Sequence, residues 1–337
     1  MTARPVPGSK WDYGVAHPDV TKAVDDLCAD DQLGLTFACV VVQHGIVVAE
    51  RYFPDSSPNA FRDGPPVPTT ADSTFISWSM AKSMTHALVG LCVEDGVLSV
   101  NDPVAVPTWH GTPKAAITVQ HLLNMRSGLG FIEDYVDDQV SHVIEMLFGS
   151  GTDDVASFAA SLPLIHEPGS HWSYSSGDTN ILARRIGELI APQAMHTYIQ
   201  ERLFDAIGMT SATAKFDAAG TFIGSSYVYA TALDFARFGL LYLHDGWWGN
   251  RRVLPTGWVD HARTPTPVPP TEAHGYGAHW WLWPYDHSLA CHGYEGQRII
   301  VLPDRDAVIV RLGKTNESQN DLLRTRLQAV IQALPTV

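Results

Sequence analysis

Ser79-Met80-Ala81-Lys82 is the most informative stretch of this sequence, because it places a hydroxyl nucleophile and an amine three residues apart. Residues at positions i and i+3 lie on one face of a helix, so the amine can reach the hydroxyl without backbone strain. The first turn of a helix also directs N–H groups and a positive partial charge towards that position. A serine there can be deprotonated, and the oxyanion formed by its attack can be stabilised.

The tetrapeptide by itself is weak evidence. With 22 serines and 6 lysines in 337 residues, one Ser-x-x-Lys pair is expected by chance about 0.4 times. The alternative interpretation is an ordinary helix start with a solvated lysine. The rest of the chain must therefore supply the context.

Strand patterns lie at both ends of the chain. Two β-branched runs, residues 36–42 and 46–52, are joined by a short Gln-His-Gly turn and predict a hairpin. Near the other end, alternating apolar segments at residues 278–283, 297–302 and 307–312 predict further strands. An amphipathic helix is expected from about residue 317 to 334.

Helical patterns fill the middle of the chain. One runs from Ser79 to about Gly96, and others cover residues 121–125, 180–190 and 231–244. The sequence thus predicts an α+β fold in which one sheet is built from both termini. The helical middle would pack against it as an insertion, with a cleft between them. We expect a sheet domain from residues 1–85 and 240–337, and a mainly helical domain from residues 86–239.

Composition narrows the function. A net charge of −14 argues against a nucleic-acid partner or an anionic membrane surface. The polar, proline-rich first nine residues predict no signal peptide, and no apolar run predicts a membrane span. The four cysteines lack Cys-x-x-Cys spacing and suggest reduced thiols in a cytoplasmic protein. The 15 histidines show no metal-ligand spacing, so no metal or other cofactor is expected. The oligomeric state stays open, with a homodimer among the options.

A second concentration of chemistry lies at residues 168–180, a Gly/Ser/Asp-rich loop that leads into a helix. The phenol of Tyr174 could accept the Ser79 proton if Lys82 kept it partly ionised, so that the two groups share one proton near neutral pH. The alternative is that Tyr174 only packs against Trp172.

A third element is the segment 291–297, which begins an expected strand near the C-terminus. Gly293 would let the backbone approach a ligand, and an edge strand there would offer N–H groups as oxyanion donors. His292 is either a polar residue of the cleft or an ordinary hydrogen-bonded histidine.

These three elements, in this order, resemble the serine β-lactamase and penicillin-binding-protein superfamily. The similarity covers most of the chain and includes residues 117–129, 203–209 and 229–239. It is strongest to the class C and family VIII esterase-like branch, and within it to the 6-aminohexanoate-dimer (nylon-oligomer) hydrolases. The resemblance implies an antiparallel sheet flanked by helices, an all-helical region, and an active site between them.

The resemblance also implies roles for individual residues. Ser79 would be the nucleophile, Lys82 its activating partner, and Tyr174 the general base and later the general acid. The backbone N–H of Ser79 and one from the strand near Tyr294 would form the oxyanion hole. The reaction would be acyl transfer to water through an ester on Ser79.

Two departures from the family pattern bear on the substrate. The third motif, usually Lys-Thr-Gly or His-x-Gly, aligns with Cys291, His292 and Gly293, so its first position carries no cation. That loss weakens recognition of a substrate carboxylate. The second motif ends in Ser176 where true β-lactamases usually have Asn. Both departures favour an esterase or small-amide hydrolase.

The acidic segment at residues 133–138 resembles the nylon-oligomer branch specifically. In that branch, a tyrosine of such a loop is thought to hydrogen-bond the leaving amide nitrogen. We therefore expect Tyr135 to line the cleft and to assist amide cleavage. The alternative is that its acidic neighbours form only a solvated loop.

The sequence accordingly predicts a serine hydrolase that cleaves small carboxylic esters or linear amides. One alternative is a D-stereospecific peptidase or weak β-lactamase on the same scaffold, and another is a catalytically silent relative that binds a ligand. An α/β-hydrolase is not favoured, because the chain has no Gly-x-Ser-x-Gly elbow.

Overall fold

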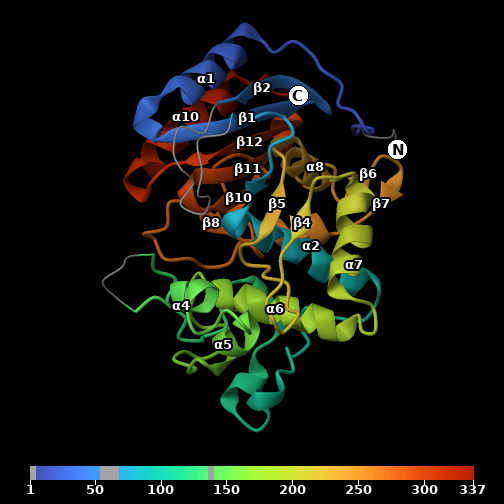
Figure 1. Cartoon of the computed structure of the whole chain (residues 1–337), viewed down its shortest axis with the longest axis vertical. Coiled ribbons are helices and arrows are strands. Elements are labelled where there is room, and N and C mark those ends of the chain that lie inside the picture. The colour runs from blue at the N-terminus through green and yellow to red at the C-terminus, as the bar shows by residue number, and fades with distance from the viewer. Residues whose placement is uncertain (1–4, 54–67, 136–139) are drawn as a thin grey trace.

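The computed structural model describes residues 5–53, 68–135 and 140–337. Within them, seven strands form one antiparallel sheet in the order β2-β1-β12-β11-β10-β9-β8 (Figure 1). Its strands are β1 (Leu35–Gln43), β2 (Ile46–Tyr52), β8 (Gly275–Tyr276), β9 (Trp281–Leu282), β10 (Leu289–Gly293), β11 (Gln297–Leu302) and β12 (Ala307–Lys314). Because β1 pairs with β12, the two ends of the chain meet in one sheet, as the sequence predicts.

The hairpin of β1 and β2 turns at His44 and Gly45, whose φ angles are +54° and +77°. Two consecutive positive φ values suit the tight turns that join antiparallel strands. In β1, Val40 and Val42 belong to one apolar core, whereas Cys39 and Val41 belong to a second core on the other side of the sheet. This alternation is the two-residue period of a strand buried on both faces.

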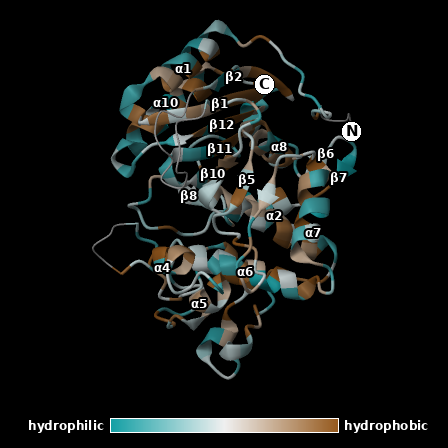
Figure 2. Cartoon of the chain, viewed as in Figure 1, coloured by the Kyte–Doolittle hydropathy of each residue, from teal (hydrophilic) through white to brown (hydrophobic). Residues whose placement is uncertain are grey.

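Helices cover both faces of the sheet. On one face, α1 (Pro18–Ala29) packs beside α10 (Asn320–Ala333), and their apolar side chains complete the second core. On the other face, α8 (Ala232–Leu243) lies against β11 and β12. A Cβ at Gly239 would lie 2.5 Å from a methyl of Val308, so a glycine is needed for this close approach. Figure 2 shows the central strands as largely hydrophobic and α1 and α10 as mixed.

The middle of the chain is mainly helical and lies below the sheet in Figure 1. Its helices are α2 (Ala81–Glu94), α3 (Val119–Leu123), α4 (His142–Phe148), α5 (Val155–Ser161), α6 (Ser176–Leu189) and α7 (Met195–Ile199). The remaining elements are α9 (Trp258–Arg263) and the short strands β3 (Phe75–Ile76), β4 (Thr213–Ala214), β5 (Val228–Ala230), β6 (Trp247–Trp248) and β7 (Arg251–Arg252). The expected domain boundaries at residues 85 and 239 fall within α2 and α8, and the division into two domains stays a prediction.

Two strand predictions need correction. Residues 278–283 do not form one strand, because His279 has a φ of +57° and its N–H donates to the carbonyl of Leu123. Only β9 (Trp281–Leu282) remains of that segment. The strand that carries the third motif, β10, is not at the edge of the sheet, since it lies between β11 and β9. However, β9 pairs with it only at Ala290, so its end at Gly293 has no strand partner on that side within the described residues.

No helix in the described part of the chain is long and apolar enough to cross a membrane. The same residues contain no cluster of three or more His, Cys, Asp or Glu side chains that could hold a metal ion.

Candidate active site

Ser79 lies in a single 3₁₀ turn, Trp78–Met80, that leads directly into α2. Trp78 has a φ of +45°, a conformation that L-residues adopt only when the surroundings enforce it. Its ring is buried and packs edge-on against Tyr294, with the centroids 5.7 Å apart. The packing therefore holds the residue before Ser79 in an unusual conformation, which is common at functional sites.

Lys82 lies on the first turn of α2, is only 1% exposed and points towards Ser79. Its Nζ donates to Ser79 Oγ at 3.0 Å, to Ser176 Oγ at 2.9 Å and to the carbonyl of Ser225 at 3.2 Å. Burial lowers the pKa of Lys82 to about 8. A substantial fraction of this amine is thus neutral near pH 8 and able to accept a proton, which a solvated lysine would not be.

Tyr174 is brought to the same place by the loop before α6. The phenol of Tyr174 forms a hydrogen bond with the side chain of Ser79. Lys82 Nζ lies 4.8 Å from the centre of the Tyr174 ring. Burial, assisted by the charge of Glu133, raises the pKa of Tyr174 well above its usual value. The raised pKa favours the neutral phenol, and the sharing of one proton between Lys82 and Tyr174 stays a prediction.

Glu133 is a further polar residue of this candidate site, and sequence reasoning did not single it out. Its carboxylate accepts hydrogen bonds from Ser176 Oγ at 2.6 Å, from Ser176 N at 2.7 Å and from Tyr135 Oη at 2.9 Å. It lies at the N-terminus of α6, where the helix dipole favours an anion. Lys82 donates to Ser176 and Ser176 donates to Glu133, so a carboxylate lies one hydroxyl away from the amine. The alternative of a purely solvated acidic loop is wrong for this residue.

Tyr135 and Tyr294 stand at the mouth of the site, with their rings stacked at a centroid distance of 4.8 Å. They are 39% and 44% exposed. A hydrogen bond to Ser79 also acts on the Tyr135 phenol, whose pKa is raised by burial and by Glu133. The structure thus places Tyr135 beside Ser79, while residues 136–138 of the acidic segment lie outside the described residues.

The end of β10 is pressed against the turn that carries Ser79. A Cβ at Gly293 would lie 2.4 Å from the carbonyl oxygen of Ser77, so only glycine fits this approach. Cys291 is buried in the core, its thiol hydrogen-bonds Ser83, and burial raises its pKa, so it supplies no reactive thiolate. His292 Nε2 accepts a hydrogen bond from Trp283 Nε1 at 2.8 Å, and burial lowers its pKa, which matches the hydrogen-bonded alternative.

Arg298 is a second residue that sequence reasoning missed. It lines a cavity of about 160 Å³ together with Trp281, whose ring stacks on Tyr174 at 5.5 Å and on His292 at 5.1 Å. The guanidinium donates to the carbonyls of Gly293 and Gln297, and burial lowers its pKa to about 9. Among the described residues, no carboxylate forms an ion pair with it. The site therefore has a cation close to the place where the third motif lacks one.

No local pattern indicated which residues Glu133 and Arg298 would contact. Glu133 lies 43 residues before its partner Ser176, and Arg298 lies on β11, the strand next to the motif strand. Packing alone brings Glu133 to Ser176 and Arg298 to the end of β10.

Comparisons with known proteins agree with this geometry. The family model described as Beta-lactamase matches residues 27–333. Protein Rv1367c of Mycobacterium tuberculosis is 28% identical, over 64% of this chain and 65% of that protein. This chain thus spans about two thirds of the length of that curated relative.

Two solved structures share the fold over most of their length. A Bacillus anthracis protein assigned as a 6-aminohexanoate-dimer hydrolase matches with a TM-score of 0.77 and 20% identity, over 100% of this chain and 92% of that one. A family VIII carboxylesterase matches with a TM-score of 0.73 and 15% identity, over 95% and 99%. The resemblance inferred from the sequence and the fold it implies are confirmed. The chain belongs to the beta-lactamase family of serine hydrolases.

Proposed function

We propose that this protein hydrolyses small carboxylic esters or linear amides through a covalent ester on Ser79. The observation that carries the proposal is the buried amine of Lys82, 3.0 Å from Ser79 Oγ and with a pKa lowered to about 8. An amine with that pKa near neutral pH is suited to remove the proton of a serine hydroxyl and to return it later.

In the first step, neutral Lys82 takes the proton of Ser79, whose oxygen attacks the carbonyl carbon of the substrate. The N–H groups of Ser79 and Tyr294 would stabilise the tetrahedral oxyanion, because one lies in the turn before α2 and the other directly follows β10. Collapse of this intermediate breaks the bond to the leaving group, which receives the proton held by Lys82.

Tyr174 serves as a neutral phenol in this scheme. Its raised pKa suits a hydrogen-bond donor that passes the proton from Lys82 towards the leaving atom, rather than a standing base. Water then attacks the ester on Ser79, and the same groups act in reverse. The ring of Trp281 stacks on the ring of Tyr174, which fixes the orientation of the phenol and supports this role.

The substrate class is inferred from Arg298, which donates to the carbonyl of Gly293 at the end of β10. Arg298 has five N–H donors, and a guanidinium of this kind can hold a carboxylate through two parallel bonds. We infer that a substrate with a terminal carboxylate binds better than a neutral one. Linear 6-aminohexanoate amides carry a terminal carboxylate, and the similar Bacillus anthracis protein is assigned to hydrolyse such a dimer. Penicillins carry a carboxylate as well.

The test is a panel of p-nitrophenyl esters, the 6-aminohexanoate dimer and nitrocefin, assayed with wild type, Ser79→Ala and the exposed control Ser318→Ala. Hydrolysis of esters or dimer that is lost in Ser79→Ala, but kept in Ser318→Ala, supports the proposal. Turnover that survives in Ser79→Ala excludes the covalent mechanism. Acylation by nitrocefin with slow release, without ester turnover, would favour the peptidase or β-lactamase alternative.

A further inference from the structure

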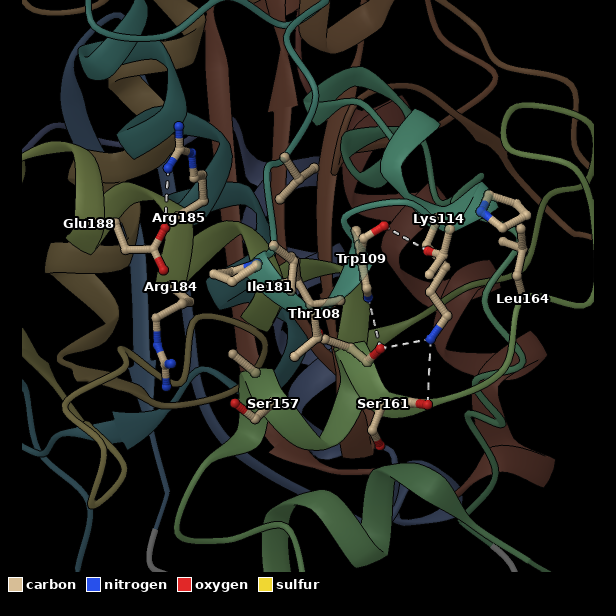
Figure 3. Close-up of a pocket in the computed structure, with 17 residues that line it drawn as sticks. Thr108, Trp109, Lys114, Ser157, Ser161, Leu164, Ile181, Arg184, Arg185 and Glu188 are labelled. Carbon is tan, nitrogen blue, oxygen red and sulfur yellow. Dashed lines mark hydrogen bonds and ion pairs between the residues drawn. The ribbon is translucent and has the colours of Figure 1, made fainter.

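A second cavity lies in the helical part of the molecule, away from the cleft. It has a volume of about 760 Å³, opens to solvent, and is lined by the segment 104–114, by α5 and by α6 (Figure 3). None of the residues assigned to the cleft lines it. Volumes of this size are typical of small-molecule sites.

The walls of this cavity are mostly apolar. The segment 104–114 contributes one wall and the facing sides of α5 and α6 contribute the other, as Figure 3 shows for Trp109 and Ile181. The apolar lining residues are Val104, Val106, Pro107, Trp109, Pro113, Ala156, Ala160, Leu164 and Ile181. Such walls favour a ligand with a hydrocarbon body.

The charged lining is cationic overall, in a chain whose net charge is −14. Three cations, Lys114, Arg184 and Arg185, face one carboxylate, Glu188. Arg184 is paired with Asp154 at 2.8 Å, and Arg185 with Glu188 at 3.2 Å.

Lys114 differs from the two arginines. Its Nζ donates to the carbonyls of Ala160 and Ser161 at 2.9 and 3.5 Å, and no carboxylate of the described residues pairs with it. Burial lowers the pKa of Lys114, and its Nζ also lies 6.0 Å from the centre of the Trp109 ring. In addition, Arg185 Nε is buried and has no hydrogen-bond partner among the described residues. The cavity thus holds positive charge that lacks an anion.

We propose that this cavity binds a small amphipathic carboxylate, an unbranched aliphatic acid of roughly six to ten carbon atoms. The hydrocarbon chain lies between Trp109 and Ile181, and the carboxylate accepts a hydrogen bond from Lys114. The site is independent of the hydrolytic cleft and does not rest on the proposed reaction.

The experiment is calorimetric titration of octanoate into the Ser79→Ala protein, so that turnover cannot interfere. We expect one binding site whose affinity falls at least about tenfold in Lys114→Met and in Thr108→Trp. Thr108 is exposed at the surface, and its side chain lines the cavity (Figure 3), so a tryptophan there fills the space without touching the core. Lys22→Met is the matched control for loss of one positive charge, because Lys22 lies on the exposed side of α1.

Neutral 1-octanol separates the two parts of the proposal. It should bind at least about tenfold more weakly than octanoate to the parent protein and equally weakly to Lys114→Met. Absence of octanoate binding at millimolar concentration overturns the proposal, as does binding that Thr108→Trp leaves unchanged. Binding that is lost in Arg298→Gln instead would place the carboxylate in the hydrolytic cleft and would also overturn it.

Discussion

Two lysines of this protein are removed from solvent to different degrees, and their surroundings give them different chemistry. Lys82 is almost fully buried, and its pKa is lowered to about 8 beside the hydroxyl of Ser79. Lys114 is only partly buried, its pKa is lowered to a lesser degree, and its hydrogen bonds go to carbonyls at the end of α5. A carbonyl oxygen has no proton to lose, whereas a hydroxyl has one. The comparison teaches why Lys82, and not Lys114, is the base in the proposed mechanism: deep burial and a proton donor coincide at Lys82.

The largest expected effect comes from removing the deeply buried amine. Lys82→Met should lower kcat for p-nitrophenyl esters by about 10³-fold or more, because it removes the amine that hydrogen-bonds Ser79, and burial raises the pKa of the neighbouring Tyr174. The matched control Lys22→Met removes an exposed ammonium and should stay within about twofold of wild type. Equal activity of Lys82→Met and Lys22→Met would contradict a catalytic role for Lys82.

The same burial has a cost in stability. The pKa of Lys82 is about 8 in the folded protein and 10.5 for an ordinary lysine, so the unfolded chain binds more protons between these values. The free energy of unfolding of wild type should therefore rise with pH from about 8 to 10.5, by about 3 kcal/mol from this group. Denaturant titrations of Lys82→Met at several pH values should lack this rise. A parallel pH dependence in both proteins would contradict the burial argument.

The pH profile of hydrolysis sharpens the assignment of the base. Because Lys82 must be neutral to accept a proton, kcat/KM should rise about tenfold per pH unit below about 8 and level off above it. The charge of Glu133 raises the pKa of Lys82, so Glu133→Gln should move the midpoint to lower pH. Glu167→Gln, an exposed substitution, is the control and should leave the midpoint in place. A profile that is flat from pH 5 to 8 would exclude Lys82 as the base.

The smallest effect is expected at the mouth of the cleft. Tyr135→Phe should reduce hydrolysis of the 6-aminohexanoate dimer by about tenfold and that of p-nitrophenyl esters by less than threefold, because an amide nitrogen needs a hydrogen bond as it leaves and a nitrophenolate does not. The ratio of the two rates is the measurement. If both rates change equally or not at all, Tyr135 does not act on the leaving group.

Much of the sheet could be predicted from its sequence. The hairpin of β1 and β2, the strand β11 and the start of β12 lie where the β-branched alternation indicates. The contact between Lys82 and Ser79 also follows from local geometry, since three residues of a helical turn separate them. By contrast, β9 is shorter than expected, because a hydrogen bond from His279 to the distant Leu123 overrides the local pattern.

The sequence by itself determined the α+β class, the placement of Ser79 beside Lys82 at the start of α2, and the family, because each depends on residue types at short, regular spacing. Only the tertiary structure decided that Glu133 accepts hydrogen bonds from Ser176, that Arg298 donates to the carbonyl of Gly293, that burial raises the pKa of Tyr174 and that a cavity lined by cations lies beside α6. The physical reason is that burial and charge act through space. A pKa depends on the solvent and the ions around a group, and packing brings these together from distant parts of the chain.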